Sequence, residues 1–375
     1  ACFAGAFFGV VGAAFAGNLL TLFVFYEILT VVTYPLVTHA GTDAARKAGR
    51  TYLGVLLSTS IGLLLFAIVW TWTVAGTVDF VEGGVLAGRA DPAAASVILA
   101  LFVFGIGKAA VMPFHRWLPA AMVAPTPVSA LLHAVAVVKT GVFALLKVTI
   151  YIFGADFLFD VPSRRPLLVV AAVTIVLASL VAMRQENLKA RLAYSTIGQL
   201  SYIVMGALLA TPSGTAGAGL HVVTHAFGKI TLFFAAGAFF IAAHKTEVSQ
   251  LRGIGRRMPW TSAFFLVGSL SILGLPPFGG TWSKWLLGVG TLEAGEPWLL
   301  GVLLCSGLLN FGYLLPIPVH AFFAQPDDPQ SLDGVGEAPL ACRIAMACTA
   351  AGCVALFCFP GPLHGLLQPV LRVGS

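Results

Sequence analysis

The chain has 375 residues, a net charge of +6 and a pI near 9.1; 58% of its residues are hydrophobic and 10% are charged. Soluble domains carry about 25% charged residues, so this composition, with a mean hydropathy of +0.94, excludes a water-soluble protein. The lysines and arginines lie mostly in loops and form no patch interleaved with exposed aromatics, which excludes a nucleic-acid partner.

Apolar stretches separated by short polar gaps follow one another along the whole chain. A bilayer core of about 30 Å takes about 20 apolar residues per helix, so hydropathy predicts an all-α membrane protein with about eleven transmembrane helices. The first stretch begins at Ala1 rather than Met and lacks the basic segment of a signal peptide, so we expect a fragment without its start. The predicted spans lie near residues 1–16, 19–38, 50–75, 93–112, 127–152, 166–183, 191–210, 217–243, 260–290, 298–323 and 341–359.

The loops alternate in charge from one side of the membrane to the other. Those on one side hold twelve Lys and Arg residues, and the opposite loops hold three. Positive charge in short loops marks the cytoplasmic side, so we place the basic side in the cytoplasm. The stretch from Ala324 to Leu340 is acidic although it falls on that side, but acidic residues count little in this rule.

Five Lys and Glu residues lie deep inside the predicted spans. Lys147 also lies in a span but is not counted with them, because it is near enough to a helix end to reach the interface. A charge at the bilayer centre costs at least about 2.5 kcal/mol, so each is a functional candidate. Structural ion pairs or helix anchors are the alternative, but one carboxylate cannot neutralise four ammonium groups. Because desolvation favours the neutral amine, we expect these lysines to exchange protons near neutral pH. The five are Glu27, Lys108, Lys139, Lys229 and Lys284.

Histidines extend this set. His221, His225 and Lys229 are spaced i, i+4, i+8 and so form one stripe on a helix face, and histidine titrates near neutrality. HxxxH could also bind a metal, but no Glu lies between the histidines, so the HExxH hydrolase motif is absent. The six cysteines form no CxxC pair, so we expect neither a metal centre nor a disulfide framework. His133, six residues before Lys139, fits a proton relay and a satisfied core histidine equally well.

Proline and glycine interrupt two of the predicted spans. In GKAAVMPFHRWLPAAM the break falls at Pro113, soon after Lys108, and in LSILGLPPFGGTWSKW it falls at Pro276 and Pro277, just before Lys284. Unpaired backbone at membrane depth is tolerated only inside protein or beside water. Paired breaks in two halves mark the ion path of transporters built from inverted repeats, although a proline alone could mean only a kink.

Several long motifs now point to one family. The run GKAAVMPFHRWLPAAMVAPTPVSALLHAVAVVKTGVFALLK resembles the signature of the antiporter-like proton-translocating subunits shared by respiratory complex I and the Mrp-type multisubunit antiporters. Further matches are FYEILTVVTYPLV, NLKARLAYSTIGQLSYIVMG, HVVTHAFGKITLFF and GLPPFGGTWSKW, which together cover nearly the whole chain. Within the family the likeness is greatest to the D subunit of the Mrp-type Na⁺/H⁺ antiporter.

The resemblance implies a fourteen-helix fold in which two sets of five helices form inverted repeats, each with a broken helix. This chain would begin at the fourth helix. The first repeat then covers 1–152, the second covers 166–323, and 324–375 holds an acidic loop, the last transmembrane helix and a short tail.

Carried over residue by residue, the resemblance also assigns the proton-transfer side chains. Glu27 matches the glutamate of the family's fifth helix, and Lys108 matches the lysine of its broken seventh helix. Lys139 matches the lysine of the eighth helix, beside His133. The stripe of His221, His225 and Lys229 matches the eleventh helix, and Lys284 the terminal lysine of the broken twelfth helix.

The expected function is therefore that of a proton-translocating subunit in a multisubunit Na⁺/H⁺ antiporter of the bacterial cytoplasmic membrane. Its partners would be the other subunits, protons, Na⁺ and membrane lipid; we expect no cofactor and no catalytic centre. The alternative is a proton-pumping subunit of complex I or of a membrane-bound hydrogenase. A transporter of organic substrates fits less well because the polar groups at mid-membrane are nearly all Lys and His, and a purely structural scaffold leaves the buried lysines unexplained.

Overall fold

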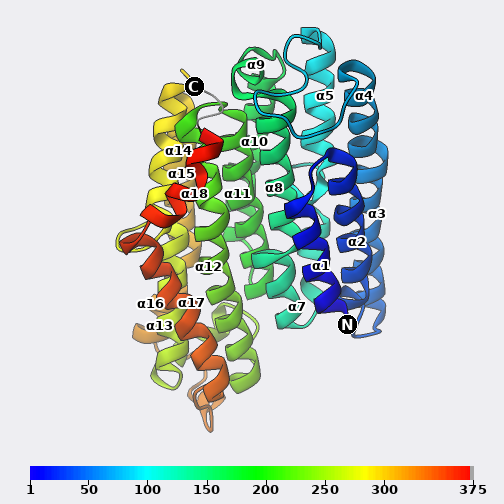
Figure 1. The fold of residues 1–375 in the computed structure, drawn as a ribbon. Helices are drawn as coiled ribbons and strands as arrows, with labels where there is room; N and C mark the ends of the chain where they lie inside the picture. Colours follow the sequence, from blue (N-terminus) through cyan, green and yellow to red (C-terminus); the bar gives the residue numbers. More distant parts are fainter. Residues whose placement is uncertain (372–375) are drawn as a thin grey trace.

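A computed structural model describes residues 1–371, which form helices, connecting loops and two isolated β-bridges. Residues 372–375, the end of the predicted tail, lie outside the described residues. The helices stand side by side in one bundle, and successive spans run in opposite directions through it (Figure 1).

Within residues 1–371 the helices form eleven successive segments along the bundle, at the places of the eleven predicted spans. Seven continuous helices are long and apolar enough to cross a membrane, and α1, α5 and α13 are shorter apolar helices; α11 starts with Lys189 and Arg191 in its first turns. The first five segments, in chain order, are α1 (Cys2–Phe15); α2 (Leu19–Val37); α3 (Asp43–Thr59) continued by η1 (Ser60–Leu64) and α4 (Leu65–Ala75); α5 (Pro92–Gly105); and α7 (Thr126–Ala130) continued by η4 (Leu131–Val135), α8 (Val137–Val148) and η5 (Thr149–Phe153). The next three are α10 (Arg164–Met183), α11 (Leu188–Leu208) and α12 (Pro212–Ala243). The last three are α13 (Pro259–Leu273) with α14 (Gly280–Glu293), α15 (Trp298–Leu314) with α16 (Pro316–Phe323), and α17 (Leu340–Cys358).

Short elements fill the breaks and the loops. After α5 the chain passes through η2 (Gly107–Ala109), α6 (Trp117–Ala120) and η3 (Ala121–Val123) before α7 begins. A second break, 274–279, separates α13 from α14. Both predicted breaks are therefore confirmed. The remaining short elements are α9 (Ala155–Asp160), η6 (Ser249–Leu251), η7 (Ile254–Arg256), η8 (Pro329–Leu332) and α18 (Gly361–Leu371).

Side-chain caps fix where several spans begin. The side chain of Asn18 accepts from Thr21 N at the start of α2, and that of Asn187 accepts from Ala190 N at the start of α11. Each cap satisfies a backbone donor that the first turn leaves free. Proline stands at the first turn of α5, α12 and α13, where its missing N–H is not needed.

The two β-bridges occupy matching places in the two halves of the chain. Asn18 pairs with Asp79, four residues after α4 ends, and Asn187 pairs with Glu247, four residues after α12 ends. The same backbone hydrogen bonds accompany both: Leu19 N donates to Val78 O, and Leu188 N donates to Thr246 O, each at 2.9 Å. This correspondence supports the inverted repeats of the fold, while the repeat boundaries 1–152 and 166–323 stay a prediction.

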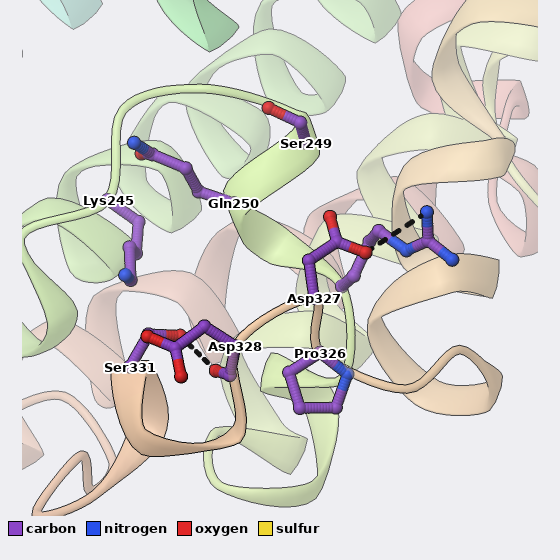
Figure 2. A pocket seen from close by; sticks show the side chains of 8 residues that line it. Lys245, Ser249, Gln250, Pro326, Asp327, Asp328 and Ser331 are labelled. Carbon is purple, nitrogen blue, oxygen red and sulfur yellow. Dashed lines mark hydrogen bonds and ion pairs between the residues drawn. The ribbon is translucent and has the colours of Figure 1, made fainter.

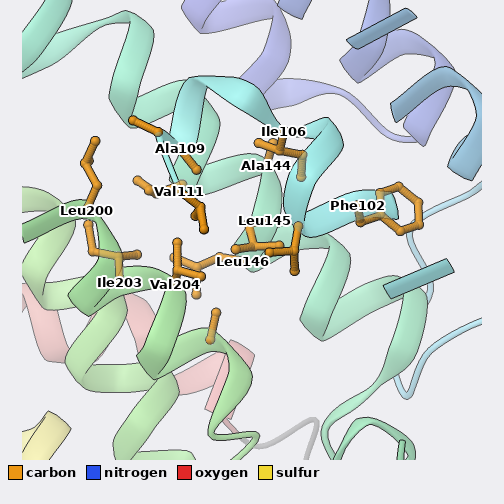
Figure 3. Packing of buried hydrophobic residues seen from close by; sticks show 14 of the residues in the cluster. Phe102, Ile106, Ala109, Val111, Ala144, Leu145, Leu146, Leu200, Ile203 and Val204 are labelled. Carbon is orange, nitrogen blue, oxygen red and sulfur yellow. The ribbon is translucent and has the colours of Figure 1, made fainter. Parts of the chain in front are cut away.

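Apolar side chains fill the space between the broken region and its neighbours. Figure 3 shows Phe102 and Ile106 from the end of α5, Leu145 from α8 and Ile203 from α11 in one cluster. Gly141 on α8 lies so close to η2 that a Cβ there would be 2.5 Å from the Lys108 carbonyl carbon. This packing sets the distance between α8 and η2, which carry two of the predicted proton-transfer lysines.

Candidate functional site

Lys108 lies in η2, inside the first break, and its side chain is fully buried. Its Nζ donates to Tyr26 O at 2.7 Å and to Thr30 Oγ1 at 2.6 Å, both on α2. The same Nζ lies 3.1 Å from the centroid of the Tyr26 ring, and Lys108 N donates to Tyr26 Oη at 3.0 Å. One turn of α2 therefore holds both the backbone and the ammonium group of Lys108.

Glu27 follows Tyr26 directly, but its carboxylate does not bind Lys108. Both Glu27 oxygens are shielded from solvent and have no hydrogen-bond partner among residues 1–371. Among residues 1–371, no ion pair within 4.0 Å includes Glu27 or Lys108. The structure thus places Glu27 and Lys108 on neighbouring elements without a direct bond between their side chains.

Lys139 on α8 is joined to the histidine stripe of α12. Its Nζ contacts His225 Nδ1, and both side chains are buried. The His225 ring stacks on the His221 ring, with centroids 5.7 Å apart and planes at 26°. His225 Nε2 has no protein partner. Three nitrogen bases from two spans are therefore in direct contact.

His221 continues the contacts to α11 and to the second broken span. Its Nε2 lies 3.0 Å from Gln199 Oε1, and its Nδ1 lies 2.9 Å from Ser283 Oγ on α14. Because an amide oxygen only accepts, this amide orientation puts the hydrogen of neutral His221 on Nε2 and leaves Nδ1 to accept from the Ser283 hydroxyl. The Tyr202 ring also stacks on the His221 ring, with the two centroids 5.6 Å apart.

Lys284 lies at the second break, next to Ser283. Its Nζ donates to Leu273 O at 3.0 Å, a carbonyl that the end of α13 leaves without a helical partner. The same Nζ lies 5.2 Å from the centroid of the Tyr202 ring, so Tyr202 contacts both His221 and Lys284. Lys284 is half-buried, unlike the other lysines of the site.

Lys229 and His133 lie off this line of contacts, toward the basic end of the bundle. Lys229 Nζ donates to Leu192 O at 3.1 Å, near the start of α11. His133 in η4 packs against Phe233, one turn beyond Lys229, with ring centroids 5.4 Å apart. Neither His133 nitrogen has a hydrogen-bond partner in the protein, so the contacts do not support the interpretation of a satisfied core histidine.

The predicted residues therefore fall into three groups. Lys139, His225 and His221 form a continuous chain that reaches Ser283 and the second break. Lys108 and Glu27 lie at the first break without a bond to Lys139. Lys229 and His133 lie on α12 and η4 without a hydrogen bond to each other or to this chain of contacts. Lys147, expected near an interface, donates to Ala16 O at 2.6 Å at the end of α1.

The neutral polar residues of the site were not predicted from the sequence. Tyr26, Thr30, Gln199, Tyr202 and Ser283 hold or link the charged groups, yet none carries a charge that would stand out in an apolar span. Gln199 gave the clearest available signal, since a buried amide in a span needs a partner. Among residues 1–371, no group of three or more His, Cys, Asp or Glu residues is placed to hold a metal ion.

Comparisons with known proteins place this geometry in a family. Residues 16–310 match the family model described as NADH:quinone oxidoreductase/Mrp antiporter, TM. The N subunit of the NADH-quinone oxidoreductase of Desulforudis audaxviator is 33% identical over 317 residues, which are 84% of this chain and 62% of that protein. The D subunit of the Na(+)/H(+) antiporter of Alkalihalophilus pseudofirmus is 28% identical over 320 residues, 84% of this chain and 64% of that protein.

A solved structure has the same fold. A chain of the membrane-bound sulfane sulfur reductase, an archaeal respiratory membrane complex, superposes with a TM-score of 0.85 at 27% identity, over 99% of this chain and 75% of that one. This chain spans a little over 60% of the length of the two curated relatives above. Those relatives come from both the antiporter branch and the quinone oxidoreductase branch.

Proposed function

Because this chain belongs to the NADH:quinone oxidoreductase/Mrp antiporter transmembrane family, we propose that it moves protons as a subunit of a multisubunit monovalent cation/proton antiporter, with Na⁺ as the exchanged cation. Its partners are the other subunits of that complex, and its place is the bacterial cytoplasmic membrane. The relative from Alkalihalophilus pseudofirmus, which belongs to an Na(+)/H(+) antiporter, supports this branch.

One observation carries the proposal: buried nitrogen bases are in contact from α8 to the second broken span. Lys139 contacts His225, His225 stacks on His221, and His221 bonds to Ser283 beside Lys284. Lysine and histidine side chains both donate and, when neutral, accept a proton. In this proposal a proton passes from one base to the next when the side chains rotate into hydrogen-bonded pairs.

Glu27 acts as the switch at the other break. When its carboxylate approaches Lys108, the pair favours the ammonium form; at 4 Å and an effective dielectric constant of about 20, the attraction is about 4 kcal/mol. When the two separate, Lys108 keeps only neutral oxygen partners on α2, and its proton moves on toward Lys139. The unpaired Glu27 oxygens and the Lys108 bonds to Tyr26 and Thr30 support this separated state.

The branch of His133 and Lys229 supplies protons from the basic side. It leads from the start of α11 to the middle of α12, where Lys229 lies one turn from His225. Lys284, half-buried beside the broken end of α13, receives protons from His221 and passes them to the exit.

Exchange in everted membrane vesicles tests the proposal. In vesicles that carry the complete complex, added Na⁺ should dissipate a respiration-driven pH gradient, and Glu27→Ala, Lys108→Ala and Lys139→Ala should each abolish this response. A Lys147→Ala control should keep it, because Lys147 binds the end of α1 away from the relay. Wild-type exchange by all three relay variants, with assembly verified, would refute the proton path.

A second candidate is a proton-pumping subunit of complex I or of a related membrane-bound hydrogenase. The relative at 33% identity, a quinone oxidoreductase subunit, favours it, and the proton path would be the same. The two candidate functions differ in the subunits to which proton movement through this chain is coupled. Mass spectrometry of the co-purifying subunits decides between them: small Mrp-type membrane subunits support the antiporter, whereas flavin and iron–sulfur subunits support the redox-driven complex.

A further inference from the structure

Two neighbouring hollows open at the basic end of the bundle, outside the line of proton-transfer contacts. The first, of about 380 Å³, lies between the starts of α7 and α11 and the end of α12. The second, of about 280 Å³, lies between α7, α12 and α17. Thr126, Pro127 and Ile241 line both, so the two hollows share a wall.

Two lysines face the first hollow. Lys189 begins α11 and donates from Nζ to Ala124 O at 2.8 Å, which leaves two of its three ammonium hydrogens free to bond. Lys245 follows α12 and lines the same hollow. Both side chains are half-buried, and neither forms an ion pair with any residue of the described chain.

Backbone contacts hold these two lysines in place relative to each other. The segments that carry them pair through the bridge between Asn187 and Glu247. Leu188 N donates to Thr246 O at 2.9 Å on one side of that bridge, and Val248 N donates to Glu186 O at 2.9 Å on the other. The positive charges thus belong to a built site rather than to free loop ends.

Acidic residues next to Lys245 are occupied elsewhere. Figure 2 shows Lys245 across an adjoining polar hollow from Asp327 and Asp328. Asp327 pairs with Arg252 at 3.4 Å, and Asp328 accepts from Gln330 N at the start of η8. Neither carboxylate lies within 4.0 Å of Lys245 Nζ, so among residues 1–371 Lys245 has no ion-pair partner.

The second hollow is lined almost entirely by apolar groups and opens at the outer surface of the bundle. On α12 its lining runs from Ile241 to Phe234, a rise of about 10 Å along the helix. Ala345 and Cys342 of α17 form the opposite side. Ile241, on the shared wall, is 56% exposed, so the surface leading from one hollow into the other is itself apolar.

We propose that the two hollows bind one anionic phospholipid of the basic-side leaflet, with its phosphate between Lys189 and Lys245 and an acyl chain along α12 in the second hollow. Basic pockets between transmembrane helices are suited to anionic headgroups, and the distance along α12 places the chain below the headgroup. The lipid would bridge α7, α11, α12 and α17. This inference is independent of the proposed function.

Lipid binding to the purified protein, in the assembly that it forms in its membrane, tests the site. Native mass spectrometry and thermal unfolding are measured with phosphatidylglycerol, phosphatidylcholine and inorganic phosphate in delipidated micelles. Phosphatidylglycerol should bind and raise the midpoint of unfolding, and the other two should not. The double variant Lys189→Ala/Lys245→Ala should bind phosphatidylglycerol about 30-fold more weakly, since each basic residue contributes about a fivefold factor.

Matched variants separate this site from general charge effects. Lys47→Ala/Arg256→Ala removes the same charge from exposed positions at the basic end and should leave binding unchanged. Ala345→Phe fills the second hollow without changing charge and should weaken binding even if the lysine variant does not assemble. Equal stabilisation by phosphatidylcholine or by inorganic phosphate alone, or unchanged phosphatidylglycerol binding in the lysine and Ala345 variants, would overturn the proposal.

Discussion

At Lys108, uncharged oxygens take the place that a carboxylate has in an ordinary ion pair. Tyr26 O and Thr30 Oγ1 both accept from its Nζ, and the Tyr26 ring lies beneath it. Such partners hold the amine in place without fixing its charge, because they make weaker bonds to an ammonium group than a carboxylate does. In the proposed mechanism, Glu27 then decides the protonation state of Lys108 by approaching or withdrawing.

Replacement of Lys108 by arginine should block proton exchange while leaving the protein folded. Arginine stays protonated under all physiological conditions, so a relay that must release the proton at this position stops. We expect at least a tenfold lower initial rate of Na⁺-dependent exchange in everted vesicles. Lys147→Arg is the control, since Lys147 donates to backbone oxygens at the end of α1 and contacts no residue of the relay. A fully active Lys108→Arg variant would show that deprotonation there is unnecessary.

Charged members of the site were predictable from the sequence, and their neutral partners were not. A lysine in an apolar span is conspicuous because of its cost, whereas Ser283 and Tyr202 resemble ordinary span residues. The contact of Lys139 with His225 joins residues 86 positions apart, and no spacing rule reaches across helices. The separated state of Glu27 also depends on rotamers that the sequence leaves open.

Among the elements, the eleven spans follow closely from hydropathy, with ends within a few residues for most of them. Pro113, Pro276 and Pro277 lie within the two stretches where the helices are interrupted, although α5 already ends at Gly105. The predicted short tail proved to contain α18, whose Leu367 packs where a side chain at Gly219 on α12 would lie. An eleven-residue helix is too short to span a membrane, so hydropathy gave no sign of it.

Because α8 approaches η2 closely, we expect that no side chain is tolerated at Gly141. A Cβ there would lie 2.5 Å from Lys108 C and 2.6 Å from Ala109 N, and backbone atoms cannot move aside cheaply. Gly141→Ala is expected to destabilise the protein by about 1–3 kcal/mol and to slow exchange by displacing Lys108. Thermal unfolding in detergent and vesicle exchange measure both effects.

Gly301 on α15 supplies the matched control for that substitution. A Cβ at Gly301 would meet no atom within 4 Å, and alanine is more favourable than glycine inside a helix. Gly301→Ala should therefore leave the exchange rate unchanged and should not lower the unfolding midpoint. If Gly141→Ala behaved in the same way, the spacing between α8 and η2 would not be set by this contact.

For the molecule as a whole, Glu296 ties two distant spans together at the acidic end. It accepts from Arg165 Nε at 2.7 Å and from Trp298 Nε1 at 2.9 Å, and Arg164 lies 3.9 Å away. Burial alone would raise the pKa of Glu296, but these hydrogen bonds and the arginine charges outweigh it and hold its pKa below the usual value. The loop before α15 is thereby fixed to the start of α10.

Because of the Glu296 carboxylate, the free energy of unfolding should decrease at acidic pH. A carboxyl with a lowered pKa in the folded state stabilises the fold above its unfolded pKa, about 4.3, and loses that contribution as the pH drops through the folded value. The unfolding midpoint should therefore decrease below about pH 4 more steeply in the wild type than in Glu296→Gln. At pH 7 the variant should be less stable by about 2 kcal/mol. Parallel pH curves for both proteins would contradict this role.

The contact chain from Lys139 to Ser283 passes from α8 through α12 to α14, three helices of one bundle whose axes run side by side (Figure 1). Its steps from helix to helix therefore run mainly across those axes. An electric potential across a membrane does work only on charge displaced along the membrane normal, about 2.3 kcal/mol per elementary charge per 100 mV. Hops along this chain are therefore nearly insensitive to voltage. The driving potential acts mainly on the steps that connect the chain to the two aqueous phases, so voltage should change the turnover rate through uptake and release rather than through transfer between the bases.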